Sequence, residues 1–148
     1  MANSTQYAKT VAASPSKIST TELHGRVRVA YADFTADAAQ ETINMFKLPD
    51  GARIIGGRLN HAALGSSTTV SVGHAAYTQA DGTVVALDVD EYKAAAASTS
   101  LTSFNIATTT ALGENSLVDS PDGLIVTATT AGANATGLIT VQMTYVLD

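Results

Sequence analysis

Hydrophobic and polar residues alternate along most of this chain, a pattern typical of β-strands with one buried face. Residues 138–147 show it most clearly, because every second residue from Ile139 to Tyr145 is apolar and the residues between them are threonine or glutamine. The pattern predicts that the chain closes with a strand that has one face in a hydrophobic core.

Similar patterns predict further strands. In residues 23–35, Arg26 and Arg28 fall on one face and two valines and a tyrosine on the other, so we expect the arginines on the solvated side. The remaining strands are expected at residues 43–48, 52–59, 68–74, 83–87, 101–106, 115–118 and 124–130. Repeated strands with turn signals between them predict an all-β sandwich of about eight antiparallel strands.

Turns and one pair of glycines separate or interrupt these strands. Two Pro-Asp-Gly segments, Pro49-Asp50-Gly51 and Pro121-Asp122-Gly123, are strong turn signals. In each, the proline fixes φ, the aspartate side chain can bond its own backbone, and the glycine accepts a positive φ. Gly56-Gly57 lies inside a strand, where paired glycines mark a bulge, a bend or the close approach of another backbone. Residues 41–77 are therefore expected to form a bent meander.

Two segments depart from the strand pattern. Residues 88–98 begin with acids and continue with four alanines, which predicts one short helix. Residues 1–21 contain Pro15 and many short polar residues but no apolar repeat. We expect residues 1–21 to form an extended N-terminal arm and residues 22–148 to form the sandwich domain; a frayed terminus is the alternative for the first segment.

The central stretch carries a family resemblance. Residues 48–57 (LPDGARIIGG), 64–68 (LGSST) and 70–73 (VSVG) resemble the jelly-roll capsid decoration, or cement, proteins of tailed bacteriophages. The resemblance covers residues 23–92 well and the remainder only by composition. It implies a jelly-roll β-sandwich that forms a homotrimer and clamps the outside of an icosahedral head, with the major capsid protein as its partner.

The composition favours a protein whose surface is partly buried in contacts with other protein subunits. A chain of 148 residues fits one domain, and it has no cysteine for a disulfide, a thiolate metal site or a thiol nucleophile. Only 14% of its residues are charged, against about 25% in typical soluble domains. A surface of small, uncharged residues suits burial against copies of the chain or a larger assembly; a monomer with a Thr/Ser-rich β surface is the alternative.

Charge is unevenly distributed along the chain. Residues 1–60 contain seven lysines and arginines and five acidic residues. Residues 61–148 contain one lysine and eight acidic residues. The acidic second half argues against nucleic-acid binding, which needs clustered cations. No stretch approaches the ~18 apolar residues of a membrane span, and the N-terminus lacks the apolar core of a signal peptide, so we expect synthesis in the host cytoplasm and no membrane partner.

The sequence offers little material for catalysis. His24, His61 and His74 follow no metal-ligand spacing, although the last two could meet across a hairpin, and no third ligand is evident. Asp88, Asp90 and Glu91 form the densest acidic group, but the stretch lacks the features of a calcium loop and fits the start of the expected helix better. We therefore expect no enzyme activity, no metal, no cofactor and no small-molecule substrate.

The leading hypothesis is a virion protein on the outer capsid surface that stabilises the head by bridging neighbouring major capsid subunits. The residues expected to contact the capsid all lie in the arm: Gln6, Tyr7, Lys9, Val11 and Lys17. One alternative is a receptor- or carbohydrate-binding fibre tip, with a pocket at loop 108–115 or 131–137. Another is a small β-fold enzyme, with His61, His74 and a carboxylate converging in one cleft.

Overall fold

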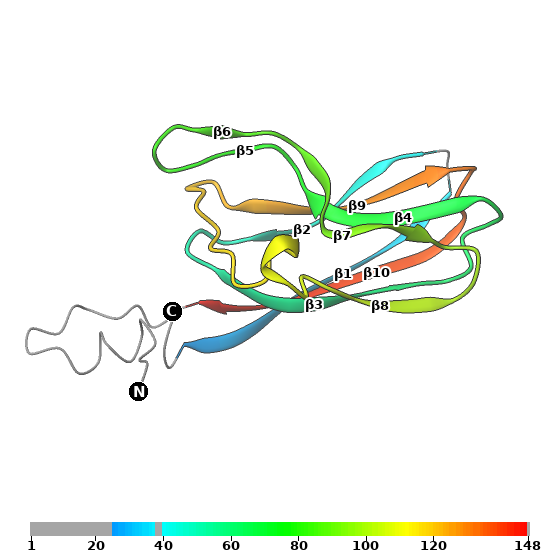
Figure 1. Cartoon of the computed structure of the whole chain (residues 1–148), viewed down its shortest axis with the longest axis horizontal. Helices are drawn as coiled ribbons and strands as arrows, with labels where there is room; N and C mark the ends of the chain where they lie inside the picture. The colour runs from blue at the N-terminus through cyan, green and yellow to red at the C-terminus, as the bar shows by residue number, and fades with distance from the viewer. Residues whose placement is uncertain (1–24, 38–39, 148) are drawn as a thin grey trace, which may run out of the picture.

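The structure is a computed structural model that describes residues 25–37 and 40–147. Eight of its strands form two four-stranded antiparallel sheets that face each other (Figure 1). The first sheet has the order β1 (Arg26–Ala36), β10 (Gly137–Leu147), β3 (Arg53–His61) and β8 (Thr102–Ile106). The second has the order β2 (Thr42–Leu48), β9 (Leu124–Gly132), β4 (Thr68–His74) and β7 (Asp88–Ala97).

The connections between these strands define the topology. β1, β2, β3 and β4 alternate between the two sheets, and so do β7, β8, β9 and β10. Neighbours within a sheet therefore come from distant parts of the chain, which is the arrangement of two interlocked Greek keys. The sandwich is a jelly roll, as expected. The meander expected for residues 41–77 is wrong, because β2 and β4 pair with β9 and β7 while β3 lies in the opposite sheet.

The core lies between the sheets and is built from alternate strand residues. Ile139, Val141 and Met143 of β10 are fully buried, as their spacing predicted, and they face buried side chains of the second sheet such as Val70 and Val126. Burial of such aliphatic side chains contributes about 1.5–3 kcal/mol each.

The paired glycines of β3 form the bulge that their sequence predicted. The register with β10 shifts between Thr144 and Tyr145, which leaves Ile55 as an extra residue, and Gly56 has φ +139. A Cβ atom added to Gly57 would collide with the carbonyl oxygen of Gln142 in β10 and would lie 2.9 Å from Cγ1 of Ile106 in β8. This close approach explains why the strand carries a residue without a side chain at that position.

The two Pro-Asp-Gly turns lie beside each other at one end of the sandwich. Gly51 and Gly123 have φ +76 and +77, and the two turns line one hollow. The Oδ1 atom of Asp50 accepts a hydrogen bond from the amide of Ser120 at 2.9 Å, which ties the first turn to the second. Both predicted turns are therefore confirmed. The structure also shows that the two turns contact each other, which the sequence did not predict.

The helix expected over residues 88–98 is wrong. This segment is strand β7, at the edge of the second sheet, and it pairs with β4 through two register shifts. Helix propensity of alanine is worth a few tenths of a kcal/mol per residue, and a segment of this length is marginal as an isolated helix. Pairing with β4 and burial of Tyr92, which is 2% exposed, outweigh that preference. The helical element among the described residues is a short 3₁₀ turn, η1 (Thr110–Leu112).

Smaller elements complete the described part of the chain. β5 (Tyr77–Thr78) and β6 (Val84–Val85) form a two-stranded ribbon around a turn at Gly82, and Figure 1 shows this ribbon projecting beyond the second sheet. The strand expected at residues 115–118 is reduced to a single bridge between Leu117 and Arg53. Among the described residues, no helix is long and apolar enough to cross a membrane.

Candidate functional site

The outward side of the first sheet carries the largest group of exposed apolar side chains on β-strands. On β1, Val27, Val29 and Tyr31 are 63%, 56% and 61% exposed. The register pairs Val29 with Thr144 and Tyr31 with Gln142, so these side chains share the polar side of β10, away from the core. The residues of this surface, called the open face below, are Val27, Val29, Tyr31, Asp33, Thr35, Ile55, Arg58, Asn60, Ser103, Asn105, Leu138, Thr140, Gln142 and Thr144.

The exposure of these valines corrects an expectation. The alternation of β1 is confirmed, but the apolar side of the strand is exposed together with Arg26 and Arg28. β1 is the edge strand of its sheet, and its small Ala30 and Ala32 side chains face inward. Val27, Val29 and Tyr31 therefore point outward, while Phe34 shares the inward side with Ile139.

The second sheet differs, because outward side chains of its two middle strands are already covered. Ser71 of β4 and Thr127 of β9 point away from the core, yet they are 4% and 0% exposed. The chain at Asp88 and Val89 lies against Gly73, where an added Cβ would be 2.8 Å from the carbonyl carbon of Asp88. The edge strands of the second sheet keep exposed outward residues such as Asn44 and Ala97, but the large exposed apolar side chains lie on the first sheet.

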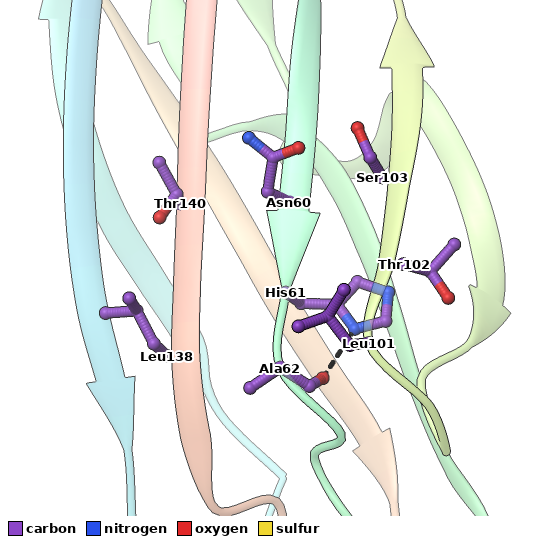
Figure 2. A pocket seen from close by; sticks show the side chains of 8 residues that line it. All are labelled: Asn60, His61, Ala62, Leu101, Thr102, Ser103, Leu138 and Thr140. Carbon is purple, nitrogen blue, oxygen red and sulfur yellow. Dashed lines mark hydrogen bonds between the residues drawn. The ribbon is translucent and has the colours of Figure 1, made fainter.

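Two hollows indent the open face. One, of about 240 Å³, lies where β3, β8 and β10 meet at their ends (Figure 2). Leu101, which is 82% exposed, and Leu138 provide much of its apolar lining. The second, of about 340 Å³, lies around Gly56 and Gly57, where a Cβ atom added to Gly56 would meet no atom nearer than 4.0 Å. Hollows of this size can accept single side chains of a partner surface.

His61 lies beneath the first hollow and is 3% exposed. Its Nδ1 donates to the carbonyl of Ala62 at 2.8 Å, an interaction drawn in Figure 2, and its ring stacks on Phe104 with centroids 5.8 Å apart. Its Nε2 has no hydrogen-bond partner among the described residues. The side chain therefore acts as a packed aromatic group in this arrangement.

His74 has a separate environment. Its Nδ1 bonds the carbonyl of Ala75 at 3.0 Å, and its ring contacts Tyr77 edge-on at 5.3 Å. His61 ends β3 and His74 ends β4, so the length of β4 separates them, roughly 20 Å at ~3.3 Å per residue. The two histidines, which the sequence allowed to meet across a hairpin, therefore lie apart, and the described residues contain no group of three His, Asp or Glu that could hold a metal ion.

A second exposed apolar feature is the β5–β6 ribbon with the residues that follow it. Val84 and Leu87 are 72% and 51% exposed. Acids surround them: the amide of Thr83 bonds Asp81 Oδ1 at 2.8 Å, and the amide of Asp90 bonds Asp88 Oδ1 at 3.0 Å. These backbone hydrogen bonds lower the pKa of Asp81 and of Asp88, which keeps both carboxylates ionised at neutral pH.

One buried and one partly buried tyrosine, Tyr92 and Tyr77, lie at the base of the ribbon. Burial raises the pKa of Tyr92, and the nearby charge of Glu91 adds to the effect. Burial also raises the pKa of Tyr77, with Asp119 and Glu91 contributing. Both phenols are therefore neutral at physiological pH and serve as packing groups.

The residues predicted for capsid contact, Gln6, Tyr7, Lys9, Val11 and Lys17, lie outside the described residues, as does the arm of residues 1–21. Loops 108–115 and 131–137, expected to hold a pocket in a fibre-tip protein, line none of the three hollows described above. The open face was missed because alternation identifies two faces of a strand without telling which one is covered.

Comparison with known proteins adds a consistent set of structures. No protein-family model and no curated protein matches the chain. Solved structures do match: a chain of the cyanophage Pam1 capsid asymmetric unit aligns with TM-score 0.61 and 22% identity, covering 84% of this chain and 86% of that one. A chain of the Ralstonia phage GP4 capsid aligns with TM-score 0.64 and 20% identity, covering 84% of this chain and 86% of that one.

A third match is a chain of the acid-stable capsid of Helicobacter pylori bacteriophage KHP30, with TM-score 0.51 and 19% identity over 82% of this chain and 87% of that one. All three come from bacteriophage capsids. At these identities the likeness establishes a shared fold, and it spans more than four fifths of every chain compared.

Proposed function

We propose that this chain is a structural protein of a bacteriophage virion, which decorates the outer capsid surface and stabilises it by bridging neighbouring major capsid subunits as a homotrimer. The observation that carries the proposal is the match of nearly the whole jelly roll to chains of three bacteriophage capsids. The resemblance of residues 48–73 to capsid decoration proteins points the same way.

The surface of the molecule supports a role in assembly. The open face is apolar and polar with few charges, which is the composition found at the centre of protein interfaces. A bridging protein acts mechanically: each copy buries surface on two neighbours, and contacts that are weak singly become strong when several are made at once. Such a protein requires neither a catalytic group nor a cofactor.

The arm contributes to capsid binding in this proposal. Tyr7, Val11 and the lysines of residues 1–21 supply apolar and cationic contacts on a chain segment long enough to reach a neighbouring subunit. A segment that orders on binding can cover a large surface, although the ordering costs part of the binding energy.

The test uses phage heads that lack this protein. Full-length protein and a variant without residues 1–20 are incubated with the heads, and the bound fraction is measured by co-sedimentation. We expect saturable binding of the full chain and at least tenfold weaker binding of the truncated chain. A variant with Tyr7→Ala, Lys9→Ala and Lys17→Ala is expected to fall between the two.

Circular dichroism and size-exclusion chromatography provide the control, because all variants should keep the sandwich and its oligomeric state. Unchanged binding of the truncated protein would refute the role of the arm. Absence of binding by the full chain would refute the capsid role itself.

A further inference from the structure

We infer that two copies of this chain pair through the free edge of β1, which joins their first sheets into one continuous antiparallel sheet. The partner is a second copy, and the two β1 strands run in opposite directions about a two-fold axis at Tyr31. This contact goes beyond the proposed homotrimer, because a two-fold contact pairs identical patches and cannot close a ring of three. It joins a copy in one trimer to a copy in the next.

The backbone of β1 has an unused side. Among residues 25–37 and 40–147, β1 pairs with β10 alone, so about half of its residues direct their N–H and C=O groups away from the sheet. A second strand of the same length along this side would form about ten hydrogen bonds, the number found in a typical protein interface. Such a row of unpaired backbone groups is a template for pairing with another chain.

β1 also lacks the features that keep other edge strands from pairing. Its register with β10 is unbroken from Arg26 to Ala36, and its sequence, RVRVAYADFTA, contains no proline, glycine or lysine. The other edges of the two four-stranded sheets are interrupted or short: register shifts break the pairing of β2 and of β7, and β8 has 5 residues. In the described part of the chain, β1 is therefore the longest uninterrupted edge.

Exposed apolar side chains lie beside this edge. Val27, Val29 and Tyr31 point away from the core and are each more than half exposed. Tyr31 is the midpoint of β1, so pairing of the whole strand with a second copy places the two Tyr31 side chains opposite each other. Val27 then lies opposite Thr35 of the second copy, and outward residues meet outward residues throughout, as antiparallel pairing requires.

Charge selects the antiparallel orientation. Arg26 and Arg28 lie at the start of β1, and Asp33 and Asp37 lie near its end; all four are exposed. Antiparallel pairing brings the basic end of each strand to the acidic end of the other, whereas parallel pairing would align like charges. The arginines lie on the inward side and Asp33 on the outward side, so the attraction acts between strand ends and does not depend on one ion pair.

A cysteine cross-link tests the register, because the chain has no cysteine of its own. Tyr31→Cys places two thiols opposite each other at the two-fold axis, where Cα atoms ~4.5–5.5 Å apart allow a disulfide. Val27→Cys is the matched control, since Val27 is 63% exposed and Tyr31 61% on the same side of β1. The two substituted Val27 positions lie roughly 26 Å apart, at ~3.3 Å per residue.

Non-reducing electrophoresis after mild oxidation reports the covalent dimer. We expect at least tenfold more dimer from Tyr31→Cys than from Val27→Cys. A mixture of Val27→Cys with Thr35→Cys should form the heterodimer, because these positions lie opposite each other. Equal cross-linking of the two single variants would overturn the inference. Cross-linking of Tyr31→Cys only after deletion of residues 1–20 would also overturn it, because the N-terminal segment would then occupy the edge.

Tyr31→Lys tests the contact without a cross-link, because two lysines opposite each other repel and charged edge strands resist pairing. Val84→Lys, at a position of β6 that is 72% exposed, is the control with the same charge change. Analytical ultracentrifugation should show that the mass of the wild-type assembly falls at least twofold in Tyr31→Lys and is unchanged in Val84→Lys, while circular dichroism verifies that both variants fold. An unchanged mass for Tyr31→Lys would contradict the β1 contact.

Binding to heads separates this inference from the proposed function. A chain that cross-links through Tyr31→Cys but does not bind heads would support the β1 contact and refute the capsid role. A chain that binds heads but whose Tyr31→Cys variant does not cross-link would do the reverse.

Discussion

Replacing Gly57 by alanine tests whether the paired glycines of β3 are required for the approach of β8. The added Cβ would collide with the backbone carbonyl oxygen of Gln142 in β10 and would lie 2.9 Å from Cγ1 of Ile106, a residue that is 1% exposed. Carbon atoms pack at ~3.5–4.0 Å, so one of the strands must move by roughly 0.6–1.1 Å. Gly57 does not have positive φ, so this effect is steric.

The cost can be estimated from that overlap. Overpacking of a buried site by one methyl group costs about 1–3 kcal/mol. Loss of the flexibility of glycine in the unfolded chain offsets about 0.4–1 kcal/mol of this. We therefore expect Gly57→Ala to lower the free energy of unfolding by about 1–2 kcal/mol and the melting temperature by about 2–8 °C.

The assay is reversible denaturant unfolding followed by circular dichroism, together with a thermal scan. Ser103→Ala is the matched control, because Ser103 is an exposed residue of β8 on the same sheet and its truncation should change stability by less than about 0.5 kcal/mol. A Gly57→Ala protein as stable as the control would show that the strands are not held at the distance described.

Three further substitutions probe other parts of the fold. Leu59→Ala, at a fully buried position, should cost about 2–5 kcal/mol in urea unfolding, whereas Leu101→Ala, at a position 82% exposed, should cost less than about 0.5; equal effects would contradict the core assignment. Asp50→Ala removes the acceptor that joins the two Pro-Asp-Gly turns and should cost about 1–3 kcal/mol, with Asp122→Ala as the less costly counterpart; the reverse order would count against the turn contact. Burial raises the pKa of Tyr92, so stability is intact below its ordinary pKa of 10.0 and is lost as the pH rises above it; Tyr92→Phe should shift alkaline unfolding to higher pH, and an unchanged midpoint would argue against its burial.

The strands could be predicted from sequence because their physical signal is local. The alternation in β10 is set by which side chains reach the core, and the glycine pair in β3 is set by the space available at the bulge. Both signals lie within a few residues of sequence. The order of strands in the sheets had no such signal, because it depends on pairs such as β1 with β10 that are a hundred residues apart.

The failures have a common cause in tertiary context. The alanine run of β7 has helical propensity, but its place beside β4 decides its conformation. The valines of β1 have the spacing of a buried face, but the register with β10 places them on the outside. The open face, which supports the proposed function, was therefore visible only after the sheets were assembled.

The proposed function requires that this chain strengthens the capsid to which it binds. The direct measurement is the temperature at which DNA-filled heads release their DNA, followed with an intercalating dye, for heads without the protein and for the same heads saturated with it. The account predicts release at a higher temperature when the protein is bound. Saturated heads that release DNA at the same temperature as bare heads would contradict it.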